Sequence, residues 1–287
     1  MLEKPMKAEL LYQQLEKDFI NPALSDDWAG RMTTIADFLT DNFKKRSMGL
    51  VCDNSRVVSR VYTTVFPSRR VMQTILDKGE GNVLLFVHHP MVWDINKTPP
   101  WHPMEAALLN QFKDKRISIY NLHVPLDSYG EYSTSVTFAK ALGIKITEPF
   151  GLYHGGLAGV FGNTEFASVT ELGERFSKVL GHRTSLYLYG GKQIEGNEVA
   201  IVAGGGNEVD ELTEAANSGI NTFLTGVTIL NDHSRPAHEF AKEKRINILG
   251  GTHYSTEKFA CIAMCDYFKK LGLPCEFIED TPVLEDL

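Results

Sequence analysis

Short hydrophobic runs alternate with amphipathic segments along most of this chain. Segments with helical spacing precede several of these runs, as in Glu105–Lys113, Glu208–Asn217 and Pro236–Lys244. Runs that are hydrophobic at every position are typical of strands covered on both faces, and strand–helix–strand order is typical of parallel sheets. We therefore predict an α/β fold with mostly parallel central strands. The clearest runs are Val83–Val87, Ile117–Leu122, Val199–Ala203, Thr222–Thr225 and Ile246–Leu249.

The beginning of the chain has a different pattern. Leu11, Leu15 and Phe19 recur at helical spacing together with Leu10, and a second apolar stretch covers Ile35–Phe43. This spacing predicts an N-terminal helical extension over residues 1–45.

Glycine concentrates at Phe150–Gly162, which is typical of a break between structural units. We place a boundary there. The prediction is a first α/β lobe over residues 46–150 and a second α/β lobe over residues 151–287. No further domain is expected between them.

Three clusters rich in histidine and carboxylate residues follow directly after predicted strands. In open α/β sheets, ligand sites gather at the edge formed by the carboxyl ends of the strands. These clusters can therefore converge in space although they lie far apart in the sequence. They are His88-His89-Pro90, the segment from His123 to Asp127, and the segment from Gly250 to Glu257 that includes His253.

The spacing inside the clusters indicates how the side chains are directed. Neighbouring side chains of an extended chain point to opposite sides, so we expect His88 and His89 to serve different ions. Pro90 keeps the backbone of His89 extended. His253 and Glu257 are four residues apart at a predicted helix start, where they share one face.

Metal binding is the chemistry that these residue types favour. Glu257 is the natural candidate to bridge two ions because a carboxylate has two oxygens, and Gly250 and Gly251 allow a tight turn before the helix. Imidazole and carboxylate together suit zinc, iron, manganese or nickel. The alternative, that each of these residues is an ordinary loop residue, is less favoured when five histidine and carboxylate side chains follow three strands. By contrast, we expect His233 and His238 at the surface.

A glycine-rich run, Val202–Asn207, also follows a predicted strand. Backbone N–H groups of such a run at a helix start can bind phosphate. The competing interpretation is that Asn207 caps the helix while Glu208, Asp210 and Glu211 complement its dipole. Those acidic residues would repel a phosphate, and the run matches no nucleotide-binding motif, so capping is favoured.

Composition and charge narrow the function classes. The 287 residues carry 29 Lys plus Arg against 36 Asp plus Glu, a formal charge of -7, which argues against broad nucleic-acid binding. No apolar run approaches the ~18 residues of a membrane span, and no signal peptide is evident. We expect a cytoplasmic protein. The cysteines match no zinc or redox motif, and Cys261 and Cys265 are expected on a buried helix face.

Together the three clusters resemble one family. HHP after a strand, H-x-P-L-D after the next and G-x-H-x-x-T-E near the carboxyl end are similar to the Nif3-like dinuclear metal proteins, many labelled GTP cyclohydrolase I type 2. The resemblance extends over about Met48–Pro282. It departs from the usual pattern at Met48-Gly49-Leu50, at Phe66 and at Val227, where other residues are more common.

The resemblance implies a ligand set for two divalent metal ions. His89 and Asp127 would bind one ion, His88 and His253 the other, and Glu257 would bridge them. His123 would lie beside the ions and move protons. The implied fold is a three-layer α/β/α arrangement of two similar lobes, often assembled as a homohexamer.

Two functions follow from this resemblance. The first is a dinuclear metal-dependent hydrolase that acts on a nucleotide-like small molecule, by GTP cyclohydrolase-type ring opening or by phosphoester hydrolysis. The alternative is a non-catalytic metal-binding or regulatory protein that interacts with other proteins. An open coordination position would favour catalysis, because a purely structural site is saturated by protein ligands.

Overall fold

The computed structural model describes residues 5–287, and the chain divides into two units, each with its own core. Unit 1 runs to Leu126 and resumes over Cys261–Thr281, whereas unit 2 comprises Asp127–Ala260 and Pro282–Leu287. This division differs from the boundary predicted at residues 150 and 151. The glycine-rich segment there is the turn region of a β-hairpin inside unit 2, formed by β9 (Lys145–Tyr153) and β10 (Gly156–Asn163).

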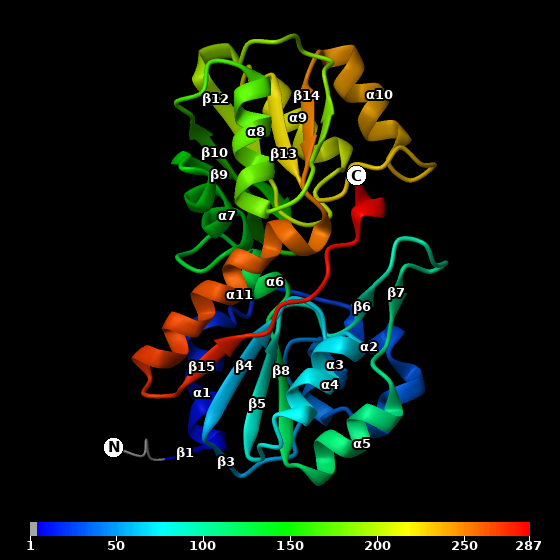
Figure 1. The fold of residues 1–287 in the computed structure, drawn as a ribbon, viewed down its shortest axis with the longest axis vertical. Coiled ribbons are helices and arrows are strands. Elements are labelled where there is room, and N and C mark those ends of the chain that lie inside the picture. The colour runs from blue at the N-terminus through cyan, green and yellow to red at the C-terminus, as the bar shows by residue number, and fades with distance from the viewer. Residues whose placement is uncertain (1–4) are drawn as a thin grey trace. The chain divides into compact units, whose positions relative to one another are not determined.

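Unit 1 is built around a five-stranded sheet with the strand order β15-β4-β5-β8-β2. Adjacent strands from β15 to β8 are parallel (Figure 1). Strand β2, at the edge, is antiparallel to β8. The strands are β2 (Gly49–Cys52), β4 (Arg60–Thr64), β5 (Val83–Val87), β8 (Ile117–Asn121) and β15 (Cys275–Phe277). Two small pairs complete the strands, β1 (Met6–Lys7) with β3 (Val57–Val58) and β6 (Val92–Trp93) with β7 (Trp101–His102).

Helices cover both faces of the unit 1 sheet. Leu85 and its neighbours on one side of β5 pack in a core with α4 (Arg69–Asp77) and α5 (Ala106–Asp114). On the opposite side, Phe86 meets Phe268 of the long helix α11 with ring centroids 5.6 Å apart. Because the alternate residues of a strand point to opposite faces, a run that is apolar throughout requires this double covering.

The N-terminal segment is largely helical, as the sequence predicts. Leu11 and Leu15 of α1 (Ala8–Phe19) are fully buried, whereas Leu10 remains 56% exposed. Three short helices follow, namely α2 (Trp28–Arg31), the 3₁₀ helix η1 (Thr33–Phe38) and α3 (Asp41–Arg46). All of them belong to unit 1 rather than forming a separate extension.

Unit 2 has a six-stranded mixed sheet with the order β11-β14-β13-β12-β10-β9. Strands β12, β13 and β14 are parallel, and β9, β10 and β11 pair antiparallel with their neighbours. The remaining strands are β11 (Ser185–Tyr187), β12 (Glu198–Ile201), β13 (Thr222–Thr225) and β14 (Asn247–Gly250). The helices are α7 (Thr134–Leu142), α8 (Val169–Leu180), α9 (Val209–Asn217), α10 (Arg235–Lys244), η2 (Glu195–Asn197) and η3 (Leu284–Asp286).

The unit 2 sheet also lies between two helical layers. Leu224 of β13 belongs to the core that contains residues of α7 and α8, and the preceding Phe223 belongs to the core that contains residues of α9 and α10. Two further helices, α6 (Val124–Asp127) and α11 (His253–Lys270), include the positions where the chain passes from one unit to the other. Each unit therefore has the α/β/α layering that the sequence predicts.

The buried helix faces account for two other sequence features. Cys261 and Cys265 are buried on α11, where the Cys261 thiol donates to the carbonyl oxygen of Thr64 at 3.1 Å. Within residues 5–287, none of the helices is both long enough and apolar enough to cross a membrane.

Leu172 and Leu186 of unit 2 provide a matched test of the core. Leu172 on α8 is buried, whereas Leu186 on the edge strand β11 is 40% exposed. We expect Leu172→Ala to lower the free energy of unfolding by about 2–5 kcal/mol because it leaves a cavity. Leu186→Ala should change it by no more than about 0.5 kcal/mol. Urea denaturation followed by circular dichroism measures both, and equal losses would contradict this assignment of the core.

Candidate metal centre

Three histidines gather at one edge of the unit 1 sheet. His88 and His89 follow strand β5, and His123 follows the neighbouring parallel strand β8. Because the two strands are parallel and adjacent, their carboxyl ends meet at the same edge. One ring nitrogen from each histidine lies within 4.8 Å of the others, and the three residues are 0%, 1% and 6% exposed. This convergence is what the strand-end positions predict.

The two adjacent histidines do not diverge as predicted. Strand β5 ends at Val87, so the alternation of an extended chain does not continue through His88 and His89. Their ring centroids lie 4.3 Å apart, with the ring planes at 65°. The expectation of opposite directions was therefore wrong for this pair.

Hydrogen bonds determine which nitrogen of His88 can act as a ligand. Its Nδ1–H donates to the carbonyl oxygen of Leu122 at 3.0 Å, since a carbonyl can only accept. The side-chain amide of Asn121 donates to the backbone carbonyl of His88. With Nδ1 protonated, a metal would be bound through Nε2, the arrangement usual for histidine ligands.

His123 is held by residues that the sequence analysis missed. Its Nδ1 lies 2.9 Å from Oδ2 of Asp26. The ring of Trp28 packs edge-on against it, with centroids 4.9 Å apart. Phe66, one of the positions that depart from the family pattern, stacks on His89 at 4.9 Å. Asp26 and Trp28 precede His123 by about a hundred residues, and no local pattern links them to it.

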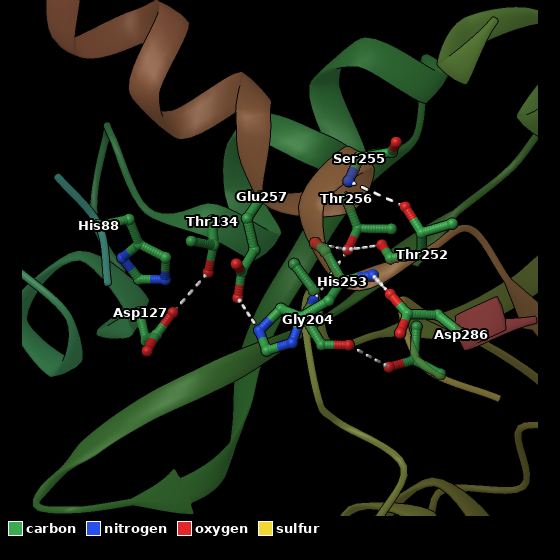
Figure 2. Close-up of polar contacts among 12 residues, drawn as sticks. His88, Asp127, Thr134, Gly204, Thr252, His253, Ser255, Thr256, Glu257 and Asp286 are labelled. Carbon is green, nitrogen blue, oxygen red and sulfur yellow. Dashed lines mark hydrogen bonds and ion pairs between the residues drawn. The ribbon is translucent and has the colours of Figure 1, made fainter. Parts of the chain in front are cut away.

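Unit 2 has its own cluster of such side chains, here called the acidic set, which consists of Asp127, His253 and Glu257. Asp127 is the last residue of α6, and Thr134 Oγ1 donates to its Oδ1 at 3.0 Å. His253 and Glu257 lie one turn apart at the start of α11, with His253 Nε2 and Glu257 Oε1 3.2 Å apart (Figure 2). One carboxylate oxygen of Asp127 lies within 4.8 Å of one of Glu257. The helical spacing of His253 and Glu257 thus gives the shared face that the sequence predicts.

The chemistry of these side chains fits a divalent cation. Asp127, His253 and Glu257 are 8%, 4% and 3% exposed. Two carboxylates this close repel one another, and burial strengthens the repulsion because little water screens it. A cation bound by both would offset that repulsion. Nitrogen and oxygen donors without thiolate suit zinc, iron, manganese or nickel.

The glycine-rich run passes close to Glu257 at Gly204, and its Asn207 does not cap the following helix. The N-cap of α9 is Glu208, without a side-chain cap, so the prediction that Asn207 caps this helix was wrong. Gly204 has a φ of +76°, and a Cβ there would lie 2.0 Å from Glu257 Oε1. Only glycine allows the backbone to pass this close to the carboxylate. Burial is the main cause that raises the pKa of Glu211 in the first turn of α9.

Gly251 is also required, but for packing. A Cβ on Gly251 would lie 2.4 Å from side-chain atoms of Phe176 and Leu180. The left-handed backbone of this turn falls on Thr252, with a φ of +67°. Gly251 therefore lets α8 pack close to the turn, and a Cβ on Gly250 would instead meet Thr228 and Ser185, whereas the sequence suggested backbone freedom.

Asp286 fixes the start of the helix that carries His253 and Glu257. Its Oδ2 accepts the backbone N–H of His253 at 2.9 Å, and its carbonyl oxygen accepts the N–H groups of Thr228 and Ile229. Figure 2 shows Asp286 directed at the first turn of α11. The first N–H groups of a helix have no partner within the helix, and a carboxylate at this end also complements the dipole.

The other histidines have separate environments. His233 is exposed, as predicted, and its Nε2 lies 3.3 Å from Glu208. The same prediction was wrong for His238, which is buried. His238 donates from Nε2 to the carbonyl of Thr228 at 2.9 Å, and the Tyr189 hydroxyl donates to its Nδ1 at 3.2 Å. Burial lowers the pKa of His238.

The cap made by Asp286 can be tested against its neighbour. Asp286→Ala removes the side-chain acceptor but keeps the backbone carbonyl, so we expect a loss of about 0.5–2 kcal/mol in the free energy of unfolding. Glu285→Ala, at an exposed position, should change it by less than about 0.5 kcal/mol. Chemical denaturation measures both changes. An unchanged free energy of unfolding in Asp286→Ala would show that the side chain does not stabilise α11.

Several known proteins are similar to this chain. A protein from Chlamydia muridarum named GTP cyclohydrolase 1 type 2 homolog is 30% identical over 215 residues, covering 70% of this chain and 76% of its own length. A protein of the same name from Borreliella burgdorferi is 29% identical over 201 residues, covering 68% of this chain and 73% of its own.

Solved structures show the same fold. The protein ybgI, described as of unknown function, superposes with a TM-score of 0.73 at 20% identity, covering 97% of this chain and all of its own. Reduced HcgD from Methanocaldococcus jannaschii gives a TM-score of 0.67 at 19% identity, with 96% and 99% covered. Residues 31–282 match the family model described as Duf34/NIF3 (NGG1p interacting factor 3). With most of its length matched, the chain belongs to the Duf34/NIF3 family.

Proposed function

We propose that this protein binds two divalent metal ions and uses them in hydrolysis. The proposed ligands are His88 and His89 of unit 1 and Asp127, His253 and Glu257 of unit 2. In the arrangement that the family resemblance implies, His89 and Asp127 serve one ion, His88 and His253 serve the other, and Glu257 bridges them.

The observation that carries this proposal is the burial of the ligand groups. All five residues are less than a tenth exposed. Polar and charged groups lose hydration when they are buried, and coordination to a metal offsets that loss. The residues also cluster within each unit, as the imidazoles of His88 and His89 do in unit 1 and the carboxylates of Asp127 and Glu257 do in unit 2.

The proposed reaction is attack by water on a carbon or phosphorus centre of a small molecule. A pair of bound divalent ions supplies activated water and stabilises negative charge on the substrate. His123 moves the protons that this reaction requires. The names of the relatives favour a nucleotide-like substrate, converted by ring opening of a purine nucleotide or by phosphoester hydrolysis.

Glu257→Gln tests the metal site and the reaction together. The protein is stripped of metal, reconstituted separately with zinc, iron, manganese or nickel, and analysed for bound metal by mass spectrometry. We expect two ions per wild-type chain and at least one fewer in Glu257→Gln, because the amide cannot bridge as a carboxylate does. Hydrolysis of GTP and of simple phosphoesters should fall by at least about 10²-fold.

Glu243→Gln is the matched control, since Glu243 is exposed on α10, a helix that holds none of the proposed ligands. It should keep both metal content and turnover. A wild-type content well below two ions after reconstitution would remove the two-metal proposal. Full metal content with no turnover above that of Glu257→Gln would instead favour a binding or regulatory role, which the family description as an interacting factor also suggests.

The hexameric assembly implied by the family resemblance is a separate prediction. Sedimentation velocity of the purified protein should give a mass near six times the chain mass of 32.1 kDa. A single species at the chain mass would contradict it. The result is independent of whether the metal proposal holds.

A further inference from the structure

We infer that Asp26 is a positioning residue that fixes the tautomer and the orientation of His123. The role of His123 in proton transfer rests on the proposed function, but its pairing with Asp26 does not. The pairing uses the N-terminal segment, which precedes the residues matched by the family model.

The contact between Asp26 and His123 is direct and buried. Oδ2 of Asp26 lies 2.9 Å from Nδ1 of His123, and the two side chains are 3% and 8% exposed. A carboxylate can only accept hydrogen bonds, so Nδ1 of His123 carries a proton, and in the neutral ring the lone pair is then on Nε2. Little solvent competes for this bond, and hydrogen bonds to charged groups are the stronger ones.

The segment around Asp26 is built to hold this contact. Two residues later, Trp28 is buried and packs edge-on against the His123 ring at 4.9 Å. The backbone N–H of Ala29 donates to Ser47 Oγ at 2.9 Å, which ties the segment to the end of α3. The imidazole is therefore fixed by a hydrogen bond at Nδ1 and by ring packing at its side.

The next residue along the chain, Asp27, lies in a different environment from Asp26. Asp27 is 65% exposed, and its Oδ2 pairs with Arg31 one helical turn later at 3.0 Å. Two consecutive aspartates thus have different environments, one against a buried imidazole and one in solvent. Asp27 offers a control that changes the same chemical group at the next position.

The pairing with Asp26 determines which ring nitrogen of His123 takes part in the proposed reaction. In the neutral ring with Nδ1–H bonded to Asp26, a proton from a reacting O–H group would go to Nε2. The O–H bond breaks, the Nε2–H bond forms, and the resulting imidazolium lies beside the Asp26 carboxylate. A carboxylate in this position orients the ring and stabilises its cation without itself becoming protonated.

Nitrogen NMR on the metal-free full chain tests the tautomer without reference to activity. Protein labelled with [¹⁵N]histidine is recorded at mildly alkaline pH, where imidazoles are neutral. His123→Gln identifies the His123 signals by their loss. We expect the wild type and Asp27→Asn to show Nδ1–H and a lone pair on Nε2. In Asp26→Asn the amide can also donate to Nδ1, so the signals should move toward the Nε2–H tautomer.

Metal content and kinetics show whether Asp26 acts through His123. Neither residue is a proposed ligand, so Asp26→Asn should keep the metal content of the wild type. If the proposed hydrolysis is observed, His123→Gln should lower kcat by about 10²–10⁴-fold and Asp26→Asn by no more than that. Residues that act as a unit are not additive, so the double variant should match His123→Gln within about twofold.

The outcomes separate this inference from the proposed function. An Nε2–H tautomer in the wild type, or His123 signals in Asp26→Asn that match those of Asp27→Asn, overturns the inference even if hydrolysis is found. Loss of metal in Asp26→Asn also overturns it, because Asp26 would then act on the ligands. Absence of hydrolysis with the expected tautomer shift supports the pairing and counts against the proposed function alone.

Discussion

Burying imidazole and carboxylate groups costs free energy unless hydrogen bonds or ions replace the lost hydration, and both units of this protein bury such groups. Each unit offsets part of the cost with contacts from outside the cluster. In unit 1 the carbonyl of Leu122 holds His88, and in unit 2 the hydroxyl of Thr134 holds Asp127. These hydrogen bonds also orient the two side chains. The positions of the candidate ligands therefore depend on the same contacts that reduce the free-energy cost of burying them.

Much of the fold could be predicted because parallel strands buried on both faces leave a plain signal. Val83–Val87 and Thr222–Thr225 are strands over the same residues that the hydrophobic pattern indicates. Histidines that follow β5 and β8 meet because adjacent parallel strands end at one edge. The spacing of His253 and Glu257 predicts a shared helix face for an equally local reason.

The missed features depend on contacts between residues far apart in the sequence. Asp26 and His123 are separated by 97 positions, and Asp286 and His253 by 33, and no periodicity connects either pair. The run at Gly204 shows the same limit: glycine before a helix suggests a cap or a phosphate loop, but the close approach of Glu257 explains it. The position of His238 near a helix start predicts a surface residue, but its Nε2–H bonds to the carbonyl of Thr228 on another segment and the residue is buried.

The interleaving of the two units along the chain has a consequence for the order of folding. Most of unit 2 is one continuous stretch, Asp127–Ala260, whereas the sheet of unit 1 gains its edge strand β15 only from residues after that stretch. A ribosome therefore releases nearly all of unit 2 before β15 can pair with β4. Contacts between such distant segments form slowly, since a long loop must close first. Until then one edge of β4 lacks its partner strand, and an unpaired edge is a site where chains associate wrongly. Unit 1, which carries the buried histidines, is accordingly the part of the molecule most exposed to misassembly during synthesis.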